Sequence, residues 1–358
     1  MKKLLCLCMA GISALMGLSG CVSAPADTTG PAATTEAVAT QSPEEAKVFK
    51  VLLIGQSLGQ DTVWLLQQVL NTEMPDKEFL IADIYESIAL NQHKANIQQE
   101  LAVYHYYKFY KGGFDHMENI SIYQALRDEM WDLILFNDAT YPSTQPGEFQ
   151  DGDHDFMINY IKENAIPGFK LGYNATWANP TSALLWDESR RDIPANVHER
   201  YARVFGGSRN MYYESVCNNI KTFIETNDAF DIVVHPGTAV QYASETHGVP
   251  EGAIDHRYEL YRDYVHLSDY GRLLVAYHLY AEIFGLEKLE AVNVDVVKQD
   301  MRFRSEQKYG DLVITQEMKD AIIASVNWAL QHPNENPPQT AREPAFLERP
   351  DLMPKKDN

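Results

Sequence analysis

Short apolar runs alternate with segments of helical periodicity along most of the chain. Five runs are apolar at nearly every position, which is typical of strands buried on both faces of a parallel sheet. They are residues 49–54, 79–84, 133–136, 170–173 and 232–234. Elsewhere apolar residues recur every three or four positions, which predicts helices. These are residues 62–70, 122–130, 211–224, 271–284 and 318–330.

This alternation predicts an α/β fold, specifically a flavodoxin-like three-layer α/β/α sandwich around a mainly parallel five-stranded sheet. In the strand order 2-1-3-4-5, the first and third strands are neighbours whose connections leave in opposite directions, so a crevice forms at their carboxyl ends. Ser57 follows the first strand, and Asn137 and Asp138 follow the third. We therefore expect these polar residues to meet at the crevice.

Two segments are not assigned to a strand or a helix. The tyrosine-rich residues 104–110 are interpreted as aromatics packed against an insertion, with stacking on sugar rings as the alternative. Residues 151–155 are dense in carboxylates but miss the calcium-loop pattern, so they are interpreted as a solvated loop.

The chain begins with the features of a bacterial lipoprotein signal peptide. Two lysines precede an apolar stretch over residues 4–18, and the string Leu18-Ser19-Gly20-Cys21 follows. A charged start, an apolar stretch too short to span a membrane and small residues before a cysteine are signal-peptide features. Residues 1–21 are therefore predicted to be a signal peptide ending in a lipobox. The predicted location is the cell envelope, with lipid on Cys21 in a bacterial membrane and the body in the periplasm or outside the cell.

The rest of the chain divides by composition. Residues 22–46 are rich in Ala, Thr and Pro and too poor in large apolar residues to bury a core, which predicts a disordered linker. Residues 47–332 contain every predicted strand and helix, and form one predicted domain. Residues 333–358 are predicted to be a proline-rich tail.

Composition also restricts the partners. The chain has 50 acidic and 30 basic residues and a formal net charge of −20 at pH 7. Nucleic acid requires a basic face on its partner, so none is expected. The histidines lack the His-x3-His or Cys-rich spacing of a metal site. We therefore predict neither a metal nor an organic cofactor.

The candidate chemistry centres on Ser57. This residue stands in the string Gly55-Gln56-Ser57-Leu58-Gly59, and Asp263 and His266 follow about 200 residues later, three residues apart. A serine at the end of a buried strand, a histidine that takes its proton and an acid that orients the histidine are the components of a serine hydrolase. The alternative is that Ser57 and Asp263 are cap and turn residues and that His266 is a polar loop residue.

The sequence resembles one family within the superfamily of SGNH or GDSL-like hydrolases, the domain of unknown function 4886. Five strings carry the resemblance, which covers roughly residues 48–332. They are Ile54-Gly55-Gln56-Ser57, Trp131-Asp132-Leu133-Ile134, Ala175-Thr176-Trp177-Ala178, Pro236-Gly237-Thr238-Ala239-Val240-Gln241 and Arg262-Asp263-Tyr264-Val265-His266-Leu267-Ser268. The resemblance implies an SGNH hydrolase domain over residues 47–332, with Ser57, Asp263 and His266 as the catalytic residues.

The oxyanion hole is expected to use the backbone N–H of Ser57 as its first donor. The resemblance places Asn137 or Asp138 near a block whose Asn side chain usually donates to the oxyanion, and Asn137 is taken as the second donor. A third donor is the backbone N–H of Ser87, or that of Ile88, where a glycine is usual. Glu86 beside Ser87 would place a negative charge near an oxyanion. Together with Gln56, which stands where Asp or Asn is usual, it favours an inactive site.

Four further residues, Gln56, Asp138, Asn174 and Trp177, are expected to line the crevice and contact the substrate. The sequence thus predicts a lipid-anchored SGNH-like serine esterase that deacylates a carbohydrate or other small ester through an acyl-serine intermediate. The competing prediction is a catalytically degenerate lipoprotein of the cell envelope that binds a glycan or other ligand.

Overall fold

The structure is a computed structural model that describes residues 47–179, 209–246, 260–261, 265–298 and 311–338. The predicted signal peptide with Cys21, the linker and residues 339–358 of the predicted tail lie outside these residues. No helix within the described ranges is long and apolar enough to cross a membrane.

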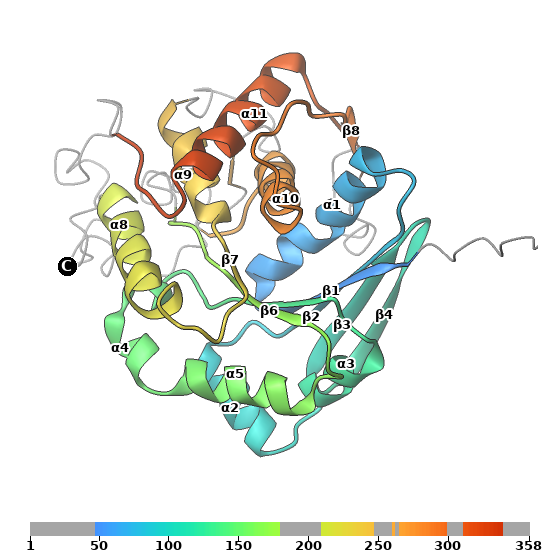
Figure 1. Ribbon diagram of the computed structural model, residues 1–358, viewed down its shortest axis with the longest axis vertical. Helices are drawn as coiled ribbons and strands as arrows, with labels where there is room; N and C mark the ends of the chain where they lie inside the picture. Colours follow the sequence, from blue (N-terminus) through green and yellow to red (C-terminus); the bar gives the residue numbers. More distant parts are fainter. Residues whose placement is uncertain (1–46, 180–208, 247–259, 262–264, 299–310, 339–358) are drawn as a thin grey trace, which may run out of the picture. The chain divides into compact units, whose positions relative to one another are not determined.

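Seven strands form one sheet between two layers of helices (Figure 1). They are β1 (Phe49–Gly55), β2 (Phe79–Tyr85), β3 (Tyr104–Tyr110), β4 (Gly113–Ile120), β5 (Leu133–Phe136), β6 (Lys170–Asn174) and β7 (Ile232–Val234), in the spatial order β4-β3-β2-β1-β5-β6-β7. Strands β2, β1, β5, β6 and β7 pair in parallel. These five are the predicted strands in the predicted order, so the α/β sandwich with a mainly parallel sheet is confirmed. A separate two-stranded sheet pairs β8 (Val296–Val297) with β9 (Leu312–Val313).

The predicted number of five strands is wrong, because β3 and β4 extend the sheet as an antiparallel hairpin on the outer edge of β2. The tyrosine-rich string is β3 itself. Its side chains alternate, with Tyr104 and Tyr106 in one apolar core and Tyr107 and Phe109 in the other. Strand β4 is largely exposed and mixes polar with apolar residues, so it has no apolar run that would predict a strand.

Helices cover both faces of the sheet (Figure 1). One layer contains α1 (Ser57–Glu73), α9 (Pro236–Thr246), α10 (Asp269–Ile283) and α11 (Gln316–Gln331). The other contains α2 (Leu90–Gln98), α3 (Ile122–Asp128), α4 (Pro146–Gln150), α5 (Asp153–Asn164), a 3-10 turn η1 (Pro142–Thr144), α8 (Arg209–Asn219) and a π-helical turn η3 (Ile220–Ile224). The five predicted helices are present within a few residues of their predicted bounds. The interpretation of residues 151–155 as a solvated loop is wrong from Asp153 onward, because α5 begins there and Asp153 is buried in an ion pair with Lys94 at 2.6 Å.

Each face of the sheet has its own apolar core, and β1 contributes to both. Val51 and Leu53 pack with α1 and α10, whereas Leu52 and Ile54 pack with α3, α5 and α8. Burial on both faces explains why β1 reads as a continuous apolar run. It also means that the carboxyl end of β1, where Ser57 follows, is held from both sides.

Candidate active site

Ser57 is the first residue of α1 and stands two residues beyond the end of β1. Gln56 caps the helix with an extended backbone, φ −112° and ψ −175°, and its carbonyl accepts from the N–H of Gly59 at 3.0 Å. The first N–H groups of a helix have no partner inside the helix, and the helix dipole favours negative charge there. The half-buried Ser57 therefore lies where an oxyanion would be stabilised.

His266 comes from the opposite end of the domain sequence and meets Ser57 directly. Its Nε2 lies 2.9 Å from Ser57 Oγ, across 209 positions of sequence. When Nε2 carries no proton, it accepts the hydrogen bond from the hydroxyl, and this is the arrangement of a nucleophile and its general base. Asp263, the predicted third member, lies outside the described residues.

The loop that carries His266 is held by contacts on both sides of it. Trp177 Nε1 donates to the carbonyl oxygen of Val265 at 2.9 Å. Tyr261 pairs with Leu267 in an isolated antiparallel bridge, and the hydroxyl of Tyr261 donates to Ala178 O at 2.7 Å. The residues after β6 therefore determine where the histidine lies.

Helix α10 begins at Asp269, immediately after this loop. Ser268 is its N-cap, and its Oγ accepts from the N–H of Gly271 at 3.1 Å. Leu260 O accepts from Ser268 N at 3.0 Å, and a Cβ at Gly271 would lie only 2.2 Å from the same carbonyl oxygen. The glycine thus lets the chain before His266 lie against the start of α10.

Asn137 packs against the turn that carries Ser57. A Cβ at Gly55 would lie 1.7 Å from Asn137 Oδ1, so the side chain occupies the space that only glycine leaves. The backbone N–H of Asn137 donates to Ile54 O at 3.2 Å, but its buried Oδ1 has no hydrogen-bond partner among the described residues. A buried polar group without a partner is costly, and such groups often mark functional sites. The side chain of Asn137 therefore lies against the Ser57 turn through an oxygen, which can only accept, and an oxyanion there would need the Nδ2 group of the same amide as its donor.

Asp138 faces the opposite layer, because successive residues of an extended chain point to opposite faces. Its Oδ1 accepts from Ala139 N at 2.6 Å, and its Oδ2 lies 4.0 Å from His154 Nε2 in α5. Burial raises the pKa of the Asp138 carboxyl from 3.8 to about 7. The predicted contact between Asp138 and the substrate has no support in this arrangement, because its partners lie in the other layer.

The loop after β2 uses its own backbone donors internally. Ser87 N–H donates to the carboxylate of Glu86 at 3.1 Å, and Ile88 N–H donates to Glu86 O at 2.8 Å. Ser87 itself is exposed. The N–H of Ser87, which was predicted to serve the oxyanion hole, therefore already donates to Glu86.

The remaining predicted crevice residues are buried. Gln56 Nε2 and Asn174 Oδ1 are both without a hydrogen-bond partner among the described residues. Trp177 is only 2 % exposed and lies in the apolar core, with its indole N–H committed to Val265. Trp177 therefore positions the histidine loop. Its burial leaves little of its surface to contact a substrate.

One close approach at this end of the sheet was not anticipated. A Cβ at Gly237 would lie 2.1 Å from Thr176 O, so the start of α9 touches the chain that leaves β6. The signal in the sequence is the string Pro236-Gly237, since proline favours the first turn of a helix and glycine permits the contact.

Comparison with known proteins adds a family and a fold. The model of a family described as Domain of unknown function (DUF4886) matches residues 50–301. The crystal structure of a DUF4886 family protein from Bacteroides uniformis superposes with a TM-score of 0.62 at 22% identity, covering 81% of this chain and 98% of that one. A protein from Slackia heliotrinireducens, provisionally named an SGNH hydrolase, has a TM-score of 0.39 at 15% identity and covers 66% of this chain and 100% of its own. No curated protein matches.

Proposed function

The chain belongs to the DUF4886 family, and from that premise we propose that it is a serine hydrolase of the SGNH type. The observation that carries the proposal is the distance of 2.9 Å between Ser57 Oγ and His266 Nε2 at the carboxyl end of β1. Two positions so far apart in sequence are brought to hydrogen-bond distance by contacts from separate elements. A serine that only occupies the first turn of α1 would need no histidine.

In the proposed reaction, Ser57 Oγ attacks the acyl carbon of an ester while His266 Nε2 takes the hydroxyl proton. The negative oxygen that forms is stabilised by the N–H of Ser57 at the start of α1 and by the amide of Asn137. Collapse expels the alcohol, which receives the proton from His266. A water molecule, deprotonated by His266, then attacks the acyl carbon; the acid leaves and the proton on His266 returns to Ser57 Oγ. Asp263 is proposed to accept from Nδ1 of His266 and fix its tautomer.

The proposed substrate is an acylated carbohydrate or another small ester, and the proposed location is the cell envelope. Both rest on the lipobox ending at Cys21. Cys21→Ser is expected to abolish lipid attachment and move the protein out of the membrane fraction. The same amount of membrane-bound protein before and after this change would refute the anchor without touching the chemistry.

A second candidate is a binding lipoprotein that does not turn its ligand over. One observation favours it: Glu86 holds the N–H groups of Ser87 and Ile88 and places a carboxylate in the loop after β2. In that case Ser57 and His266 would hold a ligand hydroxyl or carbonyl rather than break an ester.

A fluorophosphonate probe separates the two candidates, because it phosphonylates only an activated serine. The wild-type protein is expected to be labelled on Ser57, as read by peptide mass mapping, and Ser57→Ala and His266→Ala are expected to lose the label. Ser121→Ala is the matched control, since Ser121 is also a serine at the start of a helix, the N-cap immediately before α3, where its Oγ accepts from Gln124 N at 3.2 Å. Equal labelling of wild type and Ser57→Ala would exclude the serine mechanism.

A further inference from the structure

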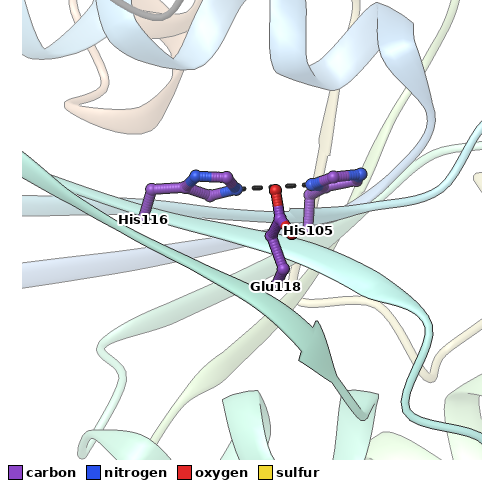
Figure 2. Close-up of side chains that lie close together, drawn as sticks. All are labelled: His105, His116 and Glu118. Atoms are coloured by element: carbon purple, nitrogen blue, oxygen red, sulfur yellow. Dashed lines mark hydrogen bonds between the residues drawn. The ribbon is translucent and has the colours of Figure 1, made fainter.

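Three side chains with metal-binding atoms meet on the β3–β4 hairpin, and we propose that they form a site for a divalent transition-metal ion of the zinc class. They are His105, His116 and Glu118, whose ligand atoms all lie within 4.8 Å of one another. His105 Nδ1 and His116 Nε2 are 3.3 Å apart. Figure 2 shows the Glu118 carboxylate directed toward the space between these two nitrogens.

The hairpin explains why these residues converge. His116 and Glu118 are two positions apart on β4, so they point to the same face of the strand. The pairing of β4 with β3 shifts register beside His105, and Asn119 has a φ of 58°. An extra residue of this kind bends a strand and redirects its side chains. Because Tyr107 pairs with His116, His105 and Glu118 each lie two positions further along the hairpin in the same direction, on the same face and beside the shift.

The distance between the two nitrogens fits coordination to one ion. Two nitrogens bound tetrahedrally to zinc at about 2.0–2.1 Å each are roughly 3.3–3.4 Å apart. Two histidines and one carboxylate are also a common zinc ligand set, and three protein ligands leave a fourth position open. The carboxylate supplies a negative charge that balances part of the charge of the ion.

Both rings are held in place before any ion binds. His116 stacks on Tyr107 with ring centroids 4.1 Å apart and planes 3° apart. His105 stacks on Tyr85 with centroids 5.5 Å apart and planes 24° apart. Fixed ring planes lower the entropy lost when a site is occupied. This distinguishes the cluster from an accidental group of surface side chains.

The cluster lies at the carboxyl ends of β1 and β2, as does the Ser57 turn. Gly55 pairs with Tyr85, and Tyr85 pairs with His105, so the three residues form one row across β1, β2 and β3. With strands about 4.8 Å apart, His105 lies roughly 10 Å from Gly55 along this row. The serine chemistry proposed above uses no ion, so the metal site stands independently of it.

The spacing rules applied to the sequence predict no metal site, because they concern ligands on one helix or in Cys-rich loops. Here one ligand precedes a hairpin turn and two follow it. The signal available in the sequence is a His-x-Glu pair on a strand, eleven residues after another histidine.

The test is a metal titration of the full chain without a histidine tag, purified by anion exchange, which its net charge of −20 allows. Zn²⁺ binding is measured by calorimetry and Co²⁺ binding by its visible spectrum. We expect one equivalent per chain, with an intense visible band typical of tetrahedral Co²⁺. Binding should weaken as the pH falls, because protons compete for the ligands.

His116→Ala is expected to weaken Zn²⁺ binding at least about 100-fold, because even partners of metal ligands cost 10–100-fold when removed. Glu118→Gln, at an exposed position, tests the site should His116→Ala fail to fold. His332→Ala is the matched control. His332 Nδ1 lies 3.2 Å from a carboxylate oxygen of Glu335, but among the described residues this pair has no second imidazole to complete a metal site. Ser57→Ala should bind Zn²⁺ like wild type.

Two results would overturn the proposal. One is the absence of stoichiometric Zn²⁺ or Co²⁺ binding by the wild-type chain. The other is equal binding by wild type, His116→Ala and Glu118→Gln, which would place the ion elsewhere. Neither result depends on probe labelling at Ser57, so failure of the metal proposal can be told apart from failure of the hydrolase proposal.

Discussion

Trp177 donates from its indole nitrogen to the carbonyl oxygen of Val265, the residue immediately before His266. The bond joins the chain that leaves β6 to the loop that carries the histidine, across 88 positions of sequence. A base that must lie within hydrogen-bond reach of its nucleophile loses rate when its loop shifts by even an ångström. In the proposed mechanism, Trp177 is therefore a positioning residue that acts through His266.

Trp177→Phe is expected to lower kcat for ester hydrolysis by roughly tenfold with little change in KM, because the loop loses its donor while the apolar packing largely remains. The free energy of unfolding should fall by about 1–2 kcal/mol. Turnover of aryl acetates and thermal unfolding measure the two effects.

Trp131→Phe is the matched control for this change. Trp131 is likewise 2 % exposed, and its Nε1 donates to Ala125 O at 3.0 Å, but it lies in the other apolar core. It should lose similar stability and keep its kcat. Equal loss of kcat in both variants would show a general effect of instability.

Ser57→Ala and His266→Ala are each expected to lower kcat by about 10³-fold or more, and the double variant should be little worse than either. The reason is that the two side chains act as one unit. Asp263→Asn should cost less or a comparable amount. Circular dichroism should show that Ser57→Ala folds, since loss of one hydroxyl costs no more than about 1–2 kcal/mol. Multiplicative effects in the double variant would contradict a shared role.

Gly55→Ala is expected to displace Asn137, because the added methyl would lie 1.7 Å from its Oδ1. We expect a loss of about 1–3 kcal/mol in stability, the usual cost of overpacking, together with weaker probe labelling of Ser57. Gly147→Ala in α4 is the control, since a Cβ there meets nothing within 4 Å. A Gly55→Ala protein with unchanged labelling would remove Asn137 from the proposed oxyanion hole.

Asp138→Asn is expected to stabilise the protein at and above pH 7. Burial raises the folded-state pKa of this carboxyl from 3.8 to about 7. Between those values the folded chain retains a proton that the unfolded chain has lost, so stability falls as the pH rises from about 4 to about 7. Asparagine cannot ionise and can still accept from Ala139 N. The gain should amount to a few kcal/mol at most, since one pKa unit corresponds to about 1.4 kcal/mol.

Denaturant unfolding of wild type and Asp138→Asn from pH 4 to pH 8 measures this gain, which should vanish toward pH 4. Asp155→Asn, at an exposed position in α5, controls for removal of one negative charge from a protein of net charge −20. A gain that does not depend on pH would contradict the assigned cause.

The five parallel strands could be predicted because burial on both faces leaves each of them apolar at most positions. The hairpin could not be predicted, because β4 is exposed and mixes polar with apolar residues, while the tyrosines of β3 contribute to both cores. Register shifts and edge pairings of this kind depend on contacts between strands, which a single sequence does not specify.

The candidate site divides in the same way. Ser57 and His266 follow from the end of a buried strand and from a motif before a capped helix, and the structure brings them within 2.9 Å. Whether Asn137 or Asp138 faces Ser57 depends on which side of the sheet the first residue after β5 points to, and the sequence does not specify this. The role of Trp177 depends on a bond to a backbone carbonyl, and backbone acceptors leave no mark on sequence.

The hairpin on β2 also determines what the outer strand of the sheet exposes. An edge strand offers unpaired backbone groups to other chains, and charged side chains and bulges discourage such pairing. Strand β4 carries Asp115, His116 and Glu118 beside its register shift, and β7 at the far end of the described sheet is only three residues long. Both ends are poor templates for a foreign strand, which protects an apolar parallel sheet from edge-to-edge aggregation.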